Sequence, residues 1–150
     1  AKIMVLALKL RTVSAATPTF VDVPQSYWAF GVVESSRDYL TGYQDSRTGV
    51  LTFEPGGVAV REDVAVAIVK AKDQGGAKAD LSLLDRFADQ DQISQALRNY
   101  VAIAVKQGYM QGTNLGFEPQ KALTRAEACA LLSRLIDRSQ FEGGKQKITL

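Results

Sequence analysis

Two copies of one residue pattern run along the chain, and this internal repeat limits what the chain can fold into. Three short segments of the first copy recur in the same order in the second: Phe20-Val21-Asp22 as Phe87-Ala88-Asp89, Phe53-Glu54-Pro55 as Phe117-Glu118-Pro119, and Val60-Arg61-Glu62-Asp63 as Thr124-Arg125-Ala126-Glu127. The offset is 67 residues for the first segment and 64 for the other two. Such a repeat indicates tandem supersecondary units that bury their apolar faces against one another.

Each copy is predicted to form a helix, a long loop and a second helix. In the first copy the opening helix is expected at about 27–39, and the closing helix includes the apolar run 64–69. In the second copy, Ser94 is the expected N-cap of the opening helix and Gly108 its C-terminal stop. The predicted fold is therefore all-α, with tandem helix-loop-helix repeats packed as a pseudo-threefold helical bundle with long loops.

The repeat also predicts boundaries along the chain. Residues 17–74 and 84–140 are the two copies, joined by a polar linker that contains Gly75-Gly76. Residues 1–11 have the apolar, Lys-containing character of the closing helices, so we expect them to be the closing helix of a preceding, truncated repeat. Their apolar run could also be the end of a signal peptide, and it is too short to span a bilayer. The incomplete repeat offers a route to self-association.

The composition argues against several functions. The chain has no histidine, which removes the commonest general base and metal ligand. A net charge of +2 without a basic stripe argues against nucleic-acid binding.

The 45–49 segment lacks the spacing of a calcium loop and is expected to be a turn. The lone Cys129 is expected to be a buried, inert thiol. Asp85, Asp89 and Asp91 have no scaffold of strands to hold them as a glycosidase pair. We therefore predict a non-catalytic module without a cofactor or a metal.

Arg61 and Arg125 are the strongest candidates for binding a ligand. Each lies in the first turn of a predicted helix, where backbone N–H groups lack intrahelical partners and favour an anion. A guanidinium fork also matches the two oxygens of a carboxylate. The alternative is that each arginine pairs on the surface with a neighbouring acid such as Glu62 or Glu118.

The closing helices are expected to begin differently in the two copies. Thr124 and Glu127 have the spacing of a capping box, in which each side chain accepts a hydrogen bond from the other residue's backbone N–H. The first copy has Val60 at the cap position, so the side-chain acceptor of the N-cap residue is missing from its capping box. Asp63 is expected to favour the positive end of the helix dipole.

Trp28 and Asp22 are further candidates near the start of the first copy. Trp28, with Tyr27 beside it, could offer an apolar face to a sugar ring, and it could equally be part of the helix core. Asp22 and its counterpart Asp89 precede predicted helices, so helix capping is the alternative to ligand contact.

These residues carry a resemblance to a known family. The chain resembles S-layer homology repeats at Phe20-Val21-Asp22-Val23-Pro24, Trp28-Ala29, Gly42-Tyr43-Gln44-Asp45, Phe53-Glu54-Pro55, Phe117-Glu118-Pro119 and Thr124-Arg125-Ala126-Glu127. It departs from the family pattern at Val60 and Asp63, and in the second copy it lacks the usual tryptophan and the usual Tyr and Asp of the loop.

The resemblance implies a three-repeat helical module on secreted bacterial proteins, located at the cell surface or cell wall. It implies binding to an anionic, often pyruvylated, secondary cell-wall polysaccharide or to a peptidoglycan-linked glycan. The carried-over binding residues are Arg61, Arg125, Trp28 and Asp22. The alternative function is a protein–protein interaction or assembly module of an S-layer or envelope protein, and neither function involves membrane insertion.

Overall fold

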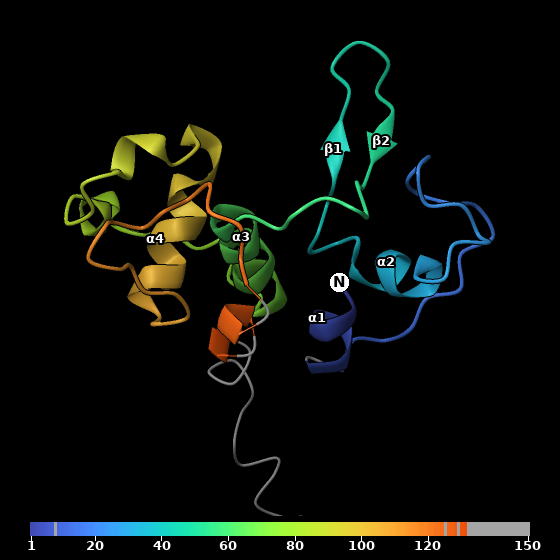
Figure 1. Cartoon of the computed structure of the whole chain (residues 1–150), viewed down its shortest axis with the longest axis horizontal. Helices are drawn as coiled ribbons and strands as arrows, with labels where there is room; N and C mark the ends of the chain where they lie inside the picture. The colour runs from blue at the N-terminus through green and yellow to red at the C-terminus, as the bar shows by residue number, and fades with distance from the viewer. Residues whose placement is uncertain (8, 125, 129, 132–150) are drawn as a thin grey trace, which may run out of the picture.

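The chain forms a mostly helical structure with one small hairpin (Figure 1). The computed structural model describes residues 1–7, 9–124, 126–128, 130 and 131. Its α-helices and strands are α1 (Lys2–Ala7), α2 (Phe30–Ser36), β1 (Tyr43–Gln44), β2 (Leu51–Thr52), α3 (Arg61–Ala71) and α4 (Arg98–Lys106). Three 3-10 turns, η1 (Leu81–Leu84), η2 (Gln90–Gln92) and η3 (Gln95–Leu97), precede α4.

The hairpin corrects the expectation of an all-α fold. Strands β1 and β2 pair antiparallel, with Tyr43 opposite Thr52, and project from the rest of the molecule (Figure 1). The turn expected near Asp45 is present, because one carboxylate oxygen of Asp45 accepts hydrogen bonds from the backbone N–H of Arg47 and from the N–H and hydroxyl of Thr48. These bonds, those from Thr48 first, lower the pKa of Asp45. The extra residues of the first copy's loop therefore form a hairpin.

Both opening helices begin later than predicted. The 27–39 helix is only α2, because residues before it form turns in which Tyr27 N–H donates to Pro24 O at 2.8 Å. Ser94 does not cap α4, which begins at Arg98 after η3. Gly108 follows α4 in a left-handed conformation, with φ of 71°, as the expected C-terminal stop requires.

Two apolar cores form around two pairs of phenylalanine rings. The smaller core contains Phe20, whose ring centroid lies 5.2 Å from that of Phe53. The larger core contains Phe87 and Phe117, with centroids 5.7 Å apart. Buried side chains of α3 belong to this larger core, and α3 packs against α4. The closing helix of the first copy therefore completes the core of the second copy.

The pseudo-threefold bundle stays a prediction. Among the described residues α3 packs on α4, and α1 packs on α2. Residues 126–128, 130 and 131 are helical, but most of the second copy's closing helix lies outside the described residues. Arg125 and Cys129 also lie outside them.

Candidate functional site

An aspartate in each copy holds the Phe-Glu-Pro loop. The two carboxylate oxygens of Asp22 accept hydrogen bonds from the backbone N–H groups of Phe53 and Glu54, at 2.8 and 2.7 Å. Asp89 binds the N–H groups of Phe117 and Glu118 in the same way, at 2.7 Å each. The prediction that these aspartates cap helices is therefore wrong, because their carboxylates clamp a distant loop instead.

The clamped loops share two further features. Glu54 and Glu118 both have left-handed backbones, with φ of 54° and 56°. A Cβ atom added to Gly112 would overlap the Phe87 ring, and one added to Gly42 would overlap the Phe20 ring. Each loop can lie against its phenylalanine only because a glycine stands there. The sequence marked these glycines as loop residues but did not predict this contact.

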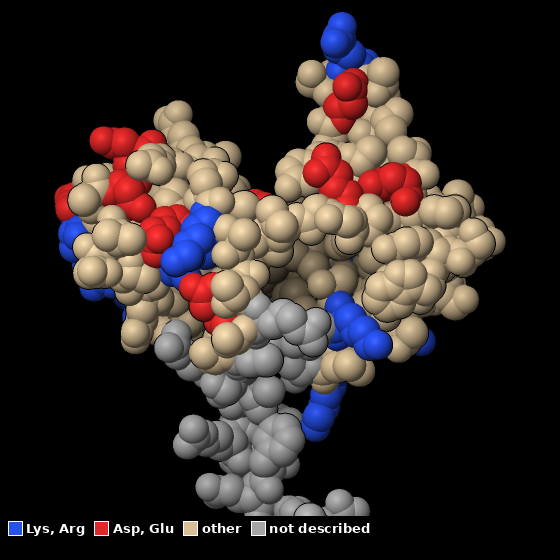
Figure 2. Space-filling model, in the orientation of Figure 1, with Lys and Arg blue, Asp and Glu red and all other residues tan. Residues whose placement is uncertain are grey.

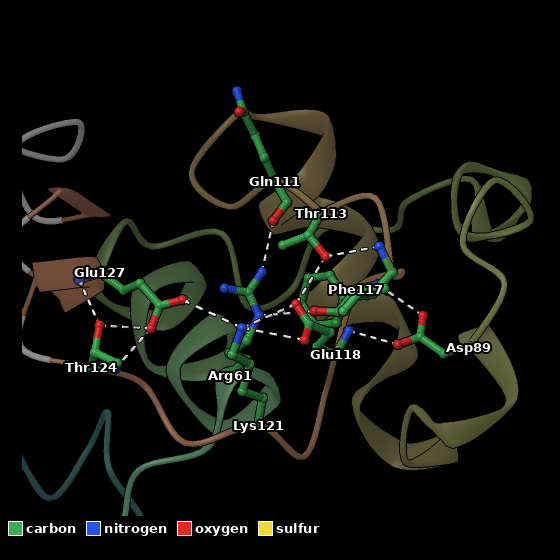
Figure 3. Close-up of polar contacts among 10 residues, drawn as sticks. Arg61, Asp89, Gln111, Thr113, Phe117, Glu118, Lys121, Thr124 and Glu127 are labelled. Atoms are coloured by element: carbon green, nitrogen blue, oxygen red, sulfur yellow. Dashed lines mark hydrogen bonds and ion pairs between the residues drawn. The ribbon is translucent and has the colours of Figure 1, made fainter.

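Arg61 is buried and reaches into the loop of the second copy (Figure 3). Its Nε donates to Phe117 O at 2.8 Å and its Nη2 donates to Gln111 O at 2.7 Å. Its Cζ lies 5.2 Å from the centroid of the Phe117 ring. The predicted alternative, a surface ion pair with Glu62 or Glu118, is wrong, since no ion pair of Arg61 occurs among the described residues.

The first turn of α3 is docked onto the segment that follows the second copy's loop. The backbone N–H of Arg61 donates to Lys121 O at 3.1 Å, and that of Glu62 donates to Pro119 O at 3.0 Å. Val60 and Ala122 form an antiparallel bridge. These N–H groups were expected to be available to an anion, but backbone carbonyls already occupy them. The guanidinium, and not the helix terminus, is therefore the candidate group for an anion at this position.

Glu62 is a buried residue whose role the sequence did not predict. Its side chain is 4% exposed, and its carboxylate accepts hydrogen bonds from Ser94 N–H at 3.0 Å, Ser94 Oγ at 2.6 Å and Gln120 Nε2 at 2.7 Å. Ser94 thus serves Glu62 of the other copy and not its own helix. Arg61 and Glu62 together join the first copy to the second.

A pocket of about 180 Å³ lies beside Arg61, and we name it the Arg61 pocket. Its polar wall contains Arg61, Gln111, Gly112 and Glu127, and its apolar wall contains Met110, Leu123, Ala130 and Leu131. In Figure 3 the Nη1 group of Arg61 points away from both carbonyls that the guanidinium binds. The pocket therefore combines a buried cation with an apolar surface.

Glu127 lines the Arg61 pocket and is paired with Thr124 beside it (Figure 3). Thr124 N–H donates to Glu127 Oε2 at 2.8 Å, and Glu127 N–H donates to Thr124 Oγ1 at 3.2 Å, which are the two bonds of a capping box. These bonds with Thr124 lower the pKa of Glu127, and the charges of Lys121 and Arg61 lower it further. Glu127 is therefore ionised at neutral pH and balances part of the positive charge here.

Trp28 lies on the surface and not in the core. Its side chain is 74% exposed, the Tyr27 ring centroid is 5.9 Å away, and Lys2 Nζ lies 5.8 Å from the ring centroid. Neither Trp28 nor Asp22 lines the Arg61 pocket. Among the described candidates, the structure therefore does not bring Trp28 and Asp22 into one site with Arg61.

Asp63 carries an electrostatic cost, contrary to the simple helix-dipole expectation. Burial raises the pKa of its carboxyl, and the charge of Glu62 raises it further. Because the folded-state pKa lies above the unfolded one, ionised Asp63 destabilises the fold at neutral pH, and protonation removes this cost as the pH falls through the folded pKa.

Replacing Asp63 with asparagine is therefore expected to stabilise the protein at pH 7 by less than about 1 kcal/mol, since the site is partly exposed. The gain should shrink as the pH is lowered through the folded pKa of Asp63, because the parent then becomes neutral at this position too. Urea unfolding at a series of pH values measures both effects. A gain that grew as the pH fell would contradict the assignment.

Acidic side chains gather on two parts of the described surface. Figure 2 shows acidic side chains around the base of the hairpin and over part of the second copy. No group of three or more residues that could hold a metal ion occurs within the described ranges. No helix in the described part of the chain is long and apolar enough to cross a membrane.

Part of the second copy matches a known protein family. Residues 86–129 match the family model of the S-layer homology domain. This match confirms the resemblance seen in the sequence for the second copy, and this family of anchoring domains is non-catalytic.

One curated relative extends this result over more of the chain. The chain is 26% identical, over 134 residues, to the cellulosome-anchoring protein of Acetivibrio thermocellus. The alignment covers 87% of this chain and 29% of that protein, so the chain spans less than a third of its relative. That relative is named for its anchoring role.

Proposed function

We propose that the chain anchors its protein by binding an anionic polysaccharide of the bacterial cell wall, with the acidic group of the glycan in the Arg61 pocket. The S-layer homology match and the anchoring relative support the anchoring role. The repeated aspartate clamps and phenylalanine pairs support residues 17–74 and 84–140 as two copies of one unit.

A single observation carries the choice of an anionic ligand. Arg61 is 6% exposed, and its bonds among the described residues go to neutral backbone carbonyls and not to a carboxylate. Glu127 balances part of this charge from the pocket wall, but among the described residues no carboxylate lies within 4.0 Å of the guanidinium. A buried cation without a direct ionic contact has lost part of its hydration and attracts an anion. A carboxylate or ketal acid at Nη1 supplies that partner, while Met110 and Leu131 offer an apolar surface to the sugar ring.

Anchoring is tested by co-sedimentation with purified walls of the bacterium that produces the protein. We expect the protein to sediment with intact walls and to remain in solution when the anionic polysaccharide has been stripped. Binding that survives stripping would overturn the proposed ligand. A stable dimer without wall affinity in sedimentation velocity would instead favour the assembly function, for which the exposed Trp28 and Val21 are the candidate surface.

Ala130 offers a test of the pocket that leaves the buried Arg61 contacts in place. Ala130 is exposed and lines the Arg61 pocket, so a longer side chain fits there. Ala130→Glu places a negative charge at the rim and is expected to weaken binding to wall polysaccharide about fivefold to tenfold by repulsion. Ala130→Gln adds nearly the same volume without charge and is the matched control. Equal affinities of the two variants in isothermal titration calorimetry would rule out an anionic group in this pocket.

A further inference from the structure

A second, more open groove adjoins the Arg61 pocket, and we name it the Arg86 groove. Its volume is about 490 Å³, and its lining includes Arg86, Phe87, Gly108 and Thr113. Gln111 and Gly112 line both the groove and the Arg61 pocket. The two sites therefore lie on either side of one short stretch of backbone.

Arg86 is held in place but has no ionic partner. Its Cζ lies 4.9 Å from the centroid of the Phe87 ring. Among the described residues it makes no salt bridge within 4.0 Å. Stacking on an aromatic face restricts the guanidinium while leaving its N–H edge open, and this edge matches the oxygens of an acidic group. Arg86 is thus oriented to bind an anion in the groove.

The two arginines lie at opposite ends of one aromatic pair. Arg86 stacks on Phe87, the Phe87 and Phe117 centroids are 5.7 Å apart, and Arg61 lies over Phe117. The distance between the two guanidinium groups therefore cannot exceed the sum of these three distances. Gly112, which lines both sites, lets the backbone lie directly against the Phe87 ring because it has no Cβ atom there.

We infer that the Arg86 groove is a second subsite for the same polysaccharide, which binds the acidic group of a neighbouring sugar unit when the first acid occupies the Arg61 pocket. This inference rests on the proposed function. Two unpaired cations along one surface fit a polymer with repeated acidic groups better than they fit a single charged sugar. Occupation of the first site raises the effective concentration of the next acidic group at the second, so the longer chain binds more tightly.

The test compares polysaccharide fragments that carry one acidic group with fragments that carry several, released from the producer's walls and separated by size. Titration calorimetry measures their affinities for the parent and for Arg86→Gln. The parent is expected to bind the longer fragments about three- to tenfold more tightly, the gain of one further partly exposed ionic contact. Arg86→Gln should remove this gain and leave the affinity for the one-acid fragments unchanged.

Arg47→Gln is the matched control, because Arg47 lies exposed in the hairpin turn and lines neither site. A loss equal to that of Arg86→Gln would show general charge attraction and overturn the subsite. An Arg86→Gln variant that kept the preference for long fragments would overturn the subsite alone, leaving the proposed function intact. A parent that bound no fragment would overturn both. Circular dichroism shows that each variant is folded before titration.

Discussion

Replacing Glu62 with alanine is expected to lower the free energy of unfolding by about 2 kcal/mol. The buried carboxylate accepts three hydrogen bonds, two from Ser94 and one from Gln120. Alanine removes all three bonds, each worth roughly 1 kcal/mol, and because Ser94 and Gln120 are exposed, water replaces part of the lost contacts. Part of the loss is offset, because the variant no longer buries a charge. Urea unfolding followed by circular dichroism at pH 7 measures the difference.

Two further variants make the Glu62 result specific. Glu62→Gln keeps the shape and one acceptor oxygen, so we expect about half of the alanine loss. Asp91→Ala removes an exposed acid in η2, and it should change the stability by less than about 0.5 kcal/mol. A Glu62→Ala loss no larger than that of Asp91→Ala would mean that the contacts between the copies do not stabilise the fold.

The sequence predicted the features that depend on local pattern. The turn at Asp45, the stop at Gly108 and the Thr124–Glu127 capping box each follow from residues within five positions of one another. The S-layer homology resemblance was also correct, because its motifs are short and lie in a fixed order. Such features are visible in one chain because neighbouring residues determine them.

The roles of Arg61 and Glu62 could not be predicted, because they depend on how the two copies dock. Their partners, Phe117 O and Ser94, lie 56 and 32 residues away in the sequence. From spacing alone, Arg61 and Glu62 were expected to be exposed, because charged side chains in the first turn of a helix usually face solvent. One signal was present: Val60 cannot cap α3 with its side chain, so the N–H groups of that helix needed partners from elsewhere.

Docking between copies also explains where the proposed binding site lies. Arg61 comes from the closing helix of the first copy, while Gln111 and Gly112 come from the loop of the second. The Arg61 pocket therefore exists only where the two copies meet, and neither copy alone contains it. A change that separates α3 from the second copy is expected to abolish binding even if every pocket residue is unchanged.

The loop clamp of the second copy provides the other large effect. Asp89→Ala is expected to lower the free energy of unfolding by about 3 kcal/mol, because it removes two charge-assisted bonds at 2.7 Å. Release of Glu118 from its left-handed backbone offsets part of this loss, because a residue with a side chain adopts that conformation at a cost. Phe117 is fully buried between Phe87 and Arg61, so loss of the clamp loosens the larger core as well.

Asp22→Ala in the first copy is the matched comparison, since it breaks the same two bonds to Phe53 and Glu54. Its expected loss is smaller, about 1–2 kcal/mol, because Glu54 is exposed and water can replace part of the lost contact. Thermal unfolding of both variants, with Asp89→Asn as the variant that keeps one acceptor, measures this order. Equal losses of stability for Asp89→Ala and Asp22→Ala would show that burial of the clamp does not affect its contribution to the free energy of unfolding. A larger loss for Asp22→Ala would contradict the expected order, because it would mean that the clamp of the first copy stabilises the fold more than the clamp of the second.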